Sequence, residues 1–213
     1  MSDLNGTAQL LVEGNNDRHV VWALCAQHKV PETFSVEIPK EDNGGVDILL
    51  KSIPVRLKIS GLRALGIIID ADQNLTGRWD AICNQLRQAG YSELPSTPGP
   101  NGSIIEVDQM PRIGIWLMPN NYLSGMLENF VSYLIPESDP LAEKAENILL
   151  DIERNGLNKY SSLHHQKAFI HTWLAWQETP GQPMGQAITA RVLNHDQPLV
   201  QTFVKWLNLL FNP

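Results

Sequence analysis

Through the first 135 positions, short apolar runs rich in β-branched residues alternate with longer segments whose apolar residues recur at helical spacing. The short runs predict strands at 8–12, 34–38, 67–69, 104–107 and 113–118. The run at 67–69 is continuous rather than alternating, which is typical of a strand buried on both faces. Helices are predicted at 17–28, 46–59 and 76–89, and another is expected to begin near 125.

After Pro136 the spacing becomes helical, and helices are predicted at 139–154, 163–177, 184–194 and 196–211. The order of elements predicts an α/β, Rossmannoid fold, in which a mostly parallel sheet has helices on both faces and a C-terminal helical extension. We assign residues 1–137 to the sheet domain and 138–213 to the helical extension, packed together as one unit.

Composition and charge narrow the class of protein. The chain has 43% hydrophobic and 18% charged residues, as expected of a globular protein rather than a disordered one. Its N-terminus lacks the basic and apolar regions of a secretory leader, and no apolar run approaches membrane-spanning length, so we expect a cytoplasmic protein without a membrane partner. The net charge of −7 gives no positive support for binding nucleic acid, although two bound divalent cations would offset much of it.

Carboxylates stand at the ends of two predicted strands. Asp70 and Asp72 follow the central strand, whereas Glu13 follows the first strand, with Gly14 expected to make a tight turn and Asp17 one helical turn further on. Open α/β sheets place ligands at the carboxyl ends of their strands, so these four acids converge if the two strands are neighbours. Because clustered carboxylates repel one another unless cations neutralise them, the pattern predicts a site for one or two Mg²⁺ or Mn²⁺ ions.

The Asp70–Asp72 pair alone is compatible with other classes of protein. Strand-end DxD pairs also occur in metal-dependent phosphatases and sugar transferases, and single acids there can merely cap a helix or complement its dipole. A phosphatase site does not account for the motif at Glu13, nor for Gln73-Asn74 after the pair.

Taken together, LLVEGNND at 10–17 and GIIIDAD at 66–72 resemble motifs of the Toprim superfamily. This catalytic domain is shared by topoisomerases, bacterial primases, recombination proteins and nucleases of the OLD (overcoming lysogenization defect) type. The resemblance covers roughly residues 8–135 and implies a toprim-like fold. It implies that Glu13, Asp70 and Asp72 bind Mg²⁺ and serve strand cleavage or joining, and it matches Asp17 to the motif's second acid.

The OLD-type branch also implies a further acid at a helix start and a lysine nearer the C-terminus. Glu128 in GMLENF fits the first role, and Lys167 is a candidate for the second. The sequence lacks the ATPase domain of full OLD proteins, so it resembles a small stand-alone toprim protein.

These observations lead to a hypothesis and a rival. The hypothesis is a Mg²⁺-dependent phosphoryl-transfer enzyme, a nuclease hydrolysing phosphodiester bonds in DNA or RNA, in which Glu13, Asp70, Asp72 and Lys167 are catalytic. Basic side chains expected to contact backbone phosphates are Arg56, Lys58, Arg63 and Arg78. The rival is a non-catalytic toprim-fold module that binds metal, nucleotide or protein, and the lack of a basic stripe favours it. The sequence does not determine the oligomeric state, and a homodimer is compatible with it.

Other side chains have structural interpretations. Cys25 and Cys83 have no CxxC partner, so buried reduced thiols are expected rather than a zinc site, and the six histidines show no ligand spacing. The tryptophans at 173, 176 and 206 are expected to anchor the helical extension to the sheet.

Overall fold

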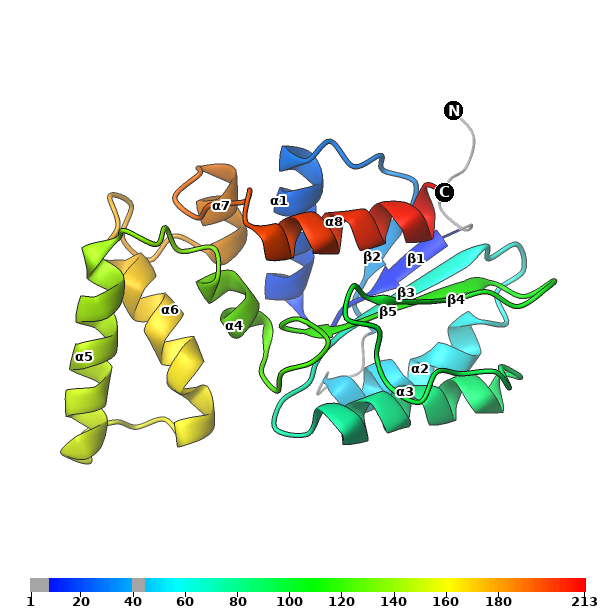
Figure 1. Cartoon of the computed structure of the whole chain (residues 1–213), viewed down its shortest axis with the longest axis horizontal. Helices are drawn as coiled ribbons and strands as arrows, with labels where there is room; N and C mark the ends of the chain where they lie inside the picture. Colours follow the sequence, from blue (N-terminus) through cyan, green and yellow to red (C-terminus); the bar gives the residue numbers. More distant parts are fainter. Residues whose placement is uncertain (1–7, 40–44) are drawn as a thin grey trace.

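A parallel sheet with one antiparallel edge strand organises the molecule (Figure 1). The computed structural model describes residues 8–39 and 45–213, so most of the N-terminal segment considered for a leader lies outside the described residues. The strand order is β2-β1-β3-β5-β4. The strands are β1 Ala8–Leu11, β2 Ser35–Glu37, β3 Ala64–Asp70, β4 Ser103–Ile105 and β5 Arg112–Met118. Only β4 runs antiparallel to its neighbour, β5, which confirms the predicted α/β fold with a mostly parallel sheet.

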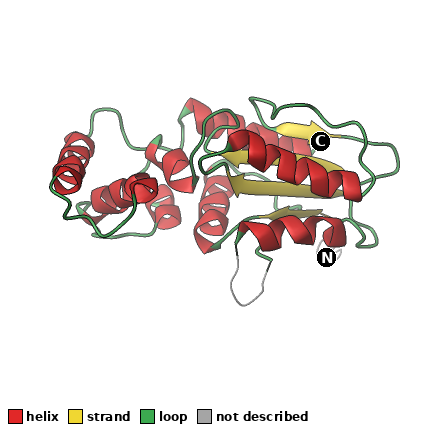
Figure 2. Cartoon of the chain, turned by 90° about the horizontal axis from the view of Figure 1, so that it is seen from below, coloured by secondary structure: helices red, strands yellow, loops and turns green. Residues whose placement is uncertain are grey.

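Helices cover both faces of the sheet (Figures 1 and 2). Three of them follow strands in the first half of the chain: α1 Asn15–Gln27, α2 Val46–Arg56 and α3 Leu75–Gln88. Side chains of β3 divide between the two faces, because Ile68 belongs to the core under α1, whereas Ile67 and Ile69 belong to the core under α2 and α3. This burial on both faces explains why the run was apolar without alternation.

The second half of the chain is helical and returns to the sheet. Its elements are α4 Leu127–Ser132, α5 Pro140–Arg154, the 3₁₀ turn η1 Ser162–His164, α6 His165–Ala175, α7 Met184–Thr189 and α8 Pro198–Phe211. α5 and α6 pack on each other beside α4, α7 packs on α1, and α8 crosses β3 and β5 (Figure 1). No helix in the described parts of the chain is long and apolar enough to cross a membrane.

Two glycines allow α8 to lie close against the sheet. Gly66 and Gly114 are paired residues of β3 and β5. A Cβ built on Gly66 would lie 2.5 Å from Leu10 Cδ1, and one built on Gly114 would lie 2.3 Å from Leu210 Cδ2. Neither position therefore has room for a side chain, and Leu210 of α8 packs directly on the backbone of the sheet.

Several local predictions were wrong. The helix expected at 184–194 ends at Thr189, and the one expected to reach residue 59 ends at Arg56, with Pro54 inside its last turn. The helix expected to begin at residue 17 begins at Asn15, and its N-cap is Gly14. A tight turn was expected at Gly14, but its backbone is extended, with φ −154°. Other residues can adopt this conformation, so the backbone at this position does not require a glycine.

The tryptophans divide into two kinds. Trp206 is buried against Trp116 of β5 and donates a hydrogen bond from Nε1 to the Ser103 carbonyl oxygen at 3.2 Å, so it anchors α8 to the sheet as predicted. Trp173 is also buried, but its Nε1 donates to Asp139 Oδ2 within the helical part. Trp176 is 38% exposed, and the prediction that it anchors the extension was wrong.

Candidate metal centre at the carboxyl end of the sheet

The first motif ends β1 and begins α1. Glu13 follows the strand, and its Oε1 accepts a hydrogen bond of 2.8 Å from the backbone N–H of Asp70, which joins the ends of β1 and β3. Asp17 lies in the first turn of α1, where its Oδ2 accepts a hydrogen bond of 3.1 Å from the N–H of Gly14. The two acids therefore hold the strand-to-helix connection in place as well as lining the site.

The second motif ends β3 and holds the start of α4. Asp70 is the last residue of β3, and its Oδ1 accepts a hydrogen bond of 2.9 Å from the N–H of Leu127, the first residue of α4. Asp72 has a positive φ of 49° and donates from its backbone N–H to the Gly125 carbonyl oxygen at 2.8 Å. Its carboxylate pairs with the guanidinium of Arg78.

Glu128 and Lys167 come from the helical part of the chain. Glu128 lies in the first turn of α4 and is only 5% exposed. The Nζ of Lys167, on α6, lies 3.3 Å from Glu128 Oε1. The pair therefore brings a cation from the extension to the end of the sheet.

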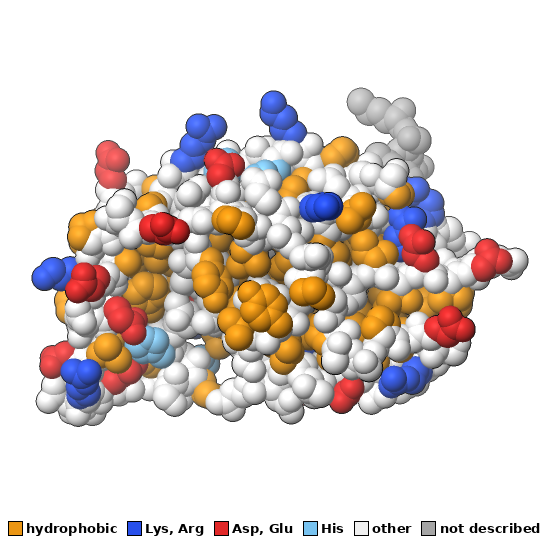
Figure 3. Space-filling model, viewed as in Figure 1, with side chains coloured by type: hydrophobic (Ala, Val, Ile, Leu, Met, Phe, Trp, Pro, Cys, Tyr) orange, Lys and Arg blue, Asp and Glu red, His pale blue; other side chains and the backbone are white. Residues whose placement is uncertain are grey.

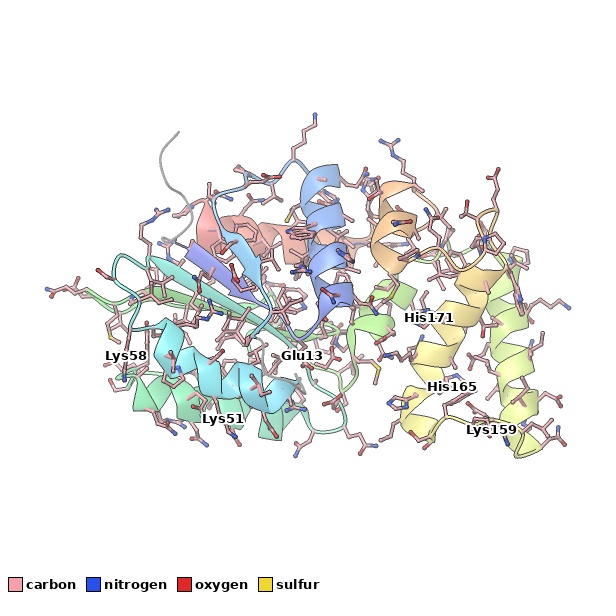
Figure 4. The ribbon with its side chains drawn as sticks, turned by 180° about the vertical axis from the view of Figure 1, so that it is seen from behind. Glu13, Lys51, Lys58, Lys159, His165 and His171 are labelled. Atoms are coloured by element: carbon pink, nitrogen blue, oxygen red, sulfur yellow. The ribbon has the colours of Figure 1, made fainter. Side chains whose placement is uncertain are left out.

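All six predicted residues line one pocket, with a volume of about 410 Å³. They are Glu13, Asp17, Asp70, Asp72, Glu128 and Lys167. Figure 4 shows Glu13 where the sheet meets the helical part, with α6 on the far side of the site. The pocket also includes His164, which the sequence did not single out for a role.

Burial and mutual repulsion raise the pKa values of three acids in this pocket, Glu13, Asp17 and Asp70. Burial raises the pKa of Asp17 to about 7, with further contributions from the negative charges of Glu13 and Glu128. Burial also raises the pKa of Asp70 well above its usual range, and the charges of Glu13, Asp17 and Glu128 add to it. The pKa of Glu13 is raised mainly by burial, against the hydrogen bond from Asp70.

The donor set suits a hard divalent cation. The hydrogen bonds from Asp70 N–H and Leu127 N–H engage one oxygen each of Glu13 and Asp70, and each carboxylate keeps a second oxygen for a ligand. Among the residues that the structure describes, however, no three carboxylates here have ligand oxygens all within 4.8 Å of one another. The site is thus wider than a closed coordination shell, which is compatible with Mg²⁺ because Mg²⁺ usually keeps several waters.

A larger cleft adjoins the acidic pocket. Its volume is about 1040 Å³, and it lies between the start of α3 on one side and η1 with the start of α6 on the other. The two cavities share Asp72, Met126 and His164. A molecule lying in the large cleft would therefore extend to the acids.

The four basic residues proposed for phosphate contacts do not gather at this site. Arg78 lines the large cleft beside Asp72. Arg63 instead lines a separate cavity with Ala8 and Ala64, at the amino ends of the strands. Arg56 donates to Gln9 Oε1 at 3.1 Å, and Lys58 is exposed beyond the end of α2, far from Glu13 in Figure 4. The crossover helix α2 runs back along the sheet, so its C-terminal residues cannot reach the carboxyl ends of the strands.

Cys25 and Cys83 are free and buried, as predicted.

The structure also brings together residues with no sequence signal. The histidines do include a close pair, because His28 and His195 lie with ring centroids 5.2 Å apart. They are 167 residues apart in the chain, so no local spacing could have indicated the contact.

Fold and site together define an α/β protein with an acid-lined pocket at the carboxyl end of a mostly parallel sheet. A protein-family model described as "Protein of unknown function (DUF3226)" matches residues 7–212, and the chain belongs to this family. No curated protein and no solved structure matches the chain.

Proposed function

We propose that this protein is a Mg²⁺-dependent phosphoryl-transfer enzyme with a toprim-like fold, a nuclease that hydrolyses phosphodiester bonds in DNA or RNA. The observation that carries the proposal is the convergence of five carboxylates and one lysine in one pocket. These side chains come from the ends of β1 and β3 and from α1, α4 and α6, and the two sequence motifs supply four of the acids.

The residues present fit one or two Mg²⁺ ions. Carboxylate oxygens are the ligands that Mg²⁺ prefers, and five carboxylates line the pocket, against a single thioether, that of Met126, and no cysteine. Glu13, Asp70 and Asp72 would hold the metal, with Asp17 and Glu128 completing the acidic wall. Bound cations would also offset the repulsion between these buried acids.

The proposed chemistry is hydrolysis by in-line displacement at phosphorus. Bound Mg²⁺ would favour ionisation of the attacking water and neutralise charge on the phosphate oxygens. The chain's own part is to hold its carboxylates in fixed positions, which the backbone N–H groups of Asp70 and Leu127 do for Glu13 and Asp70. Lys167 can turn its Nζ from Glu128 toward a phosphate and stabilise negative charge there.

The large cleft offers room for the nucleic acid on either side of the scissile phosphate. Its volume of about 1040 Å³ exceeds that of the acidic pocket, and Arg78 and His164 line it. Asn74, Gln166 and Ser162 add neutral hydrogen-bonding groups to its walls. Such a cleft favours a single strand threaded past the acids over a rigid duplex gripped by a broad basic surface.

The distribution of surface charge is compatible with binding of a single strand in the cleft and not with binding of a duplex on a broad basic surface. On the face shown in Figure 3, Lys and Arg side chains are scattered, and no continuous basic stripe crosses that face. Because the net charge of the chain is also −7, recognition by backbone charge alone is weak, and affinity has to come from the cleft and the bound metal. The same feature supports the rival function, a module that binds metal without cleaving nucleic acid.

A cleavage assay with matched variants tests the proposal. Plasmid DNA, single-stranded DNA and single-stranded RNA are incubated with the full chain and Mg²⁺ or Mn²⁺, and with Glu13→Gln and Asp70→Asn. We expect cleavage by the wild type and a loss of at least about 10³-fold in each variant, because each substitution removes a proposed metal ligand. Asp80→Asn is the control, since Asp80 is exposed on α3 and does not line the pocket.

Two outcomes would overturn the proposal. Cleavage that survives both Glu13→Gln and Asp70→Asn would place the activity elsewhere or in a contaminant. Absence of cleavage on all three substrates, together with a Mg²⁺-dependent rise in melting temperature that both variants lose, would show the binding module instead.

A further inference from the structure

His28 and His195 form a second cluster of ligand-type side chains at the opposite end of α1. His28 directly follows α1, and His195 and Asp196 lie in the connection between α7 and α8. The Nε2 of His28 lies 2.9 Å from the carbonyl oxygen of His195, and the two rings meet edge to face at 88°. Tertiary packing of α7 on α1 thus brings this connection to the end of the helix.

The hydrogen bond leaves His28 prepared as a ligand. A carbonyl oxygen can only accept, so Nε2 carries the proton and the lone pair of the neutral ring is on Nδ1. Histidines that bind metals usually donate their other ring N–H to a carbonyl or carboxylate in this way, which fixes the tautomer and the orientation of the ring.

His195 contributes a nitrogen that lacks a partner. Its Nδ1 is buried and forms no hydrogen bond among the described residues, a costly state for a polar atom. The nearest acid is Asp196, whose Oδ1 lies 3.4 Å away and whose side chain is 72% exposed. A buried nitrogen thus lies beside a carboxylate that is free to move from the solvent side.

The three side chains together have the arrangement of a cation site. One ligand atom from each of His28, His195 and Asp196 lies within 4.8 Å of the others, and this is the one such group of three found in the described parts of the chain. Two imidazoles and one carboxylate suit a borderline transition metal such as Zn²⁺, whereas Mg²⁺ takes oxygen ligands. Tetrahedral Zn²⁺ holds its donor atoms on the order of 3.3 Å apart, which a small movement of exposed Asp196 would achieve.

We propose that His28, His195 and Asp196 bind a divalent transition-metal ion, with Zn²⁺ as the natural occupant. The ion would link the end of α1 to the connection between α7 and α8, and would leave a fourth position for water. This connection is already held on its other side, because the N–H of Asn194 donates to the Leu134 carbonyl oxygen at 2.7 Å.

The proposed zinc site is independent of the acidic pocket. Asp17 lies in the first turn of α1 and His28 directly follows its last residue, eleven positions further on, which corresponds to roughly 16 Å along the helix axis. The ligand chemistry also differs, so failure of one proposal leaves the other standing.

Metal titration of tag-free, chelator-treated protein tests the site. Co²⁺ is titrated by its visible absorption and then displaced with Zn²⁺, and bound metal is counted after dialysis. In excess Mg²⁺, which keeps the acidic pocket occupied, we expect one tightly bound equivalent in the wild type, and a loss of affinity of at least tenfold in His28→Ala and in His195→Ala. His171→Ala, which changes an exposed histidine outside the cluster, and Glu13→Gln, in the acidic pocket, should both bind as the wild type does.

A milder variant guards against loss of folding. Asp196→Asn changes an exposed side chain and leaves the packed histidines in place, so it should keep the native circular dichroism spectrum and still lose at least tenfold in affinity. Zn²⁺ binding that is unchanged in all three variants, or that is detectable only at millimolar metal, would overturn the proposal.

Discussion

The two ends of α1 carry opposite kinds of chemistry. At its N-terminal end, Glu13 and Asp17 meet Asp70 in a pocket of hard oxygen ligands. At its C-terminal end, His28 meets His195 and Asp196 in a cluster dominated by borderline nitrogen ligands. One helix therefore separates two candidate metal sites that should select different ions.

The difference also concerns how each group tolerates burial. Carboxylates are charged in water, and burial disfavours the charged form, so burial raises the pKa of Asp17 and Asp70. Ionising these acids in the absence of a metal therefore costs free energy of folding. Imidazoles can be buried neutral, and the cost at the histidine cluster is a single unpaired nitrogen, His195 Nδ1. We therefore expect metal and pH to affect the acidic end more strongly than the histidine end.

After substitution of the proposed metal ligands themselves, the largest effect is expected from Lys167, which joins the acidic end to the helical extension. Lys167→Ala should lower kcat for cleavage by about 100-fold, because it removes the cation expected to stabilise charge on the phosphate. Lys159→Ala is the matched control, since Lys159 is an exposed lysine of the same extension that does not line the pocket. Equal rates for the wild type and Lys167→Ala would remove the lysine from the mechanism.

Thermal unfolding with two metals should separate the two ends. At a metal concentration 100 times the dissociation constant, either ion should stabilise the wild type by about 2.7 kcal/mol, or roughly 5–10 °C in melting temperature. Asp70→Asn should abolish the effect of Mg²⁺ and keep that of Zn²⁺, whereas His195→Ala should do the reverse. Loss of both effects in either variant would show that the two ends are coupled.

The metal-free protein should respond to pH through the acidic end. The folded pKa of Asp17 is about 7 and lies above its unfolded value, so the folded state binds more protons between about pH 4 and 7. This group therefore favours folding at low pH, and its contribution is lost as pH rises toward 7. In chelator at pH 8, Asp17→Asn should raise the melting temperature by roughly 4–8 °C, on the order of 2 kcal/mol.

The control for this pH effect is Asp80→Asn on the exposed side of α3, which should leave the melting temperature within about 1 °C. The measurement is calorimetry at pH 5 and pH 8. A gain from Asp17→Asn that is the same at both pH values would show a packing effect and not the titration of the carboxyl group.

The smallest effect is expected at Arg78, where the acidic pocket opens into the large cleft. Arg78→Ala should weaken binding of single-stranded nucleic acid a few-fold and lower the salt slope of log K by about one, because a single phosphate contact is lost. Arg87→Ala, at the exposed end of the same helix, should leave both quantities unchanged. An unchanged salt slope in Arg78→Ala would place the strand outside the large cleft.

Local sequence signals were sufficient to predict most of the helices and strands, and the positions of four of the acids at the ends of strands. The run at 67–69 predicted a strand buried on both faces, and Asp70 ends that strand. Trp176 was misjudged, because a helical spacing shows which residues share a face but not whether that face meets the sheet or solvent. The helix expected at 184–194 was predicted too long for a similar reason, since its later residues form a loop held by contacts with Ala187 and Leu134.

The sequence by itself determined where strands and helices follow one another along the chain, and that carboxylates stand at the ends of strands. Both depend on the spacing of residues within a short stretch of chain. Only the tertiary structure decided which distant groups meet. The pairing of Lys167 with Glu128 depends on α6 packing on α4. The contact of His28 with His195 depends on α7 packing on α1. Such contacts follow from the burial of whole helix faces, which no short motif encodes.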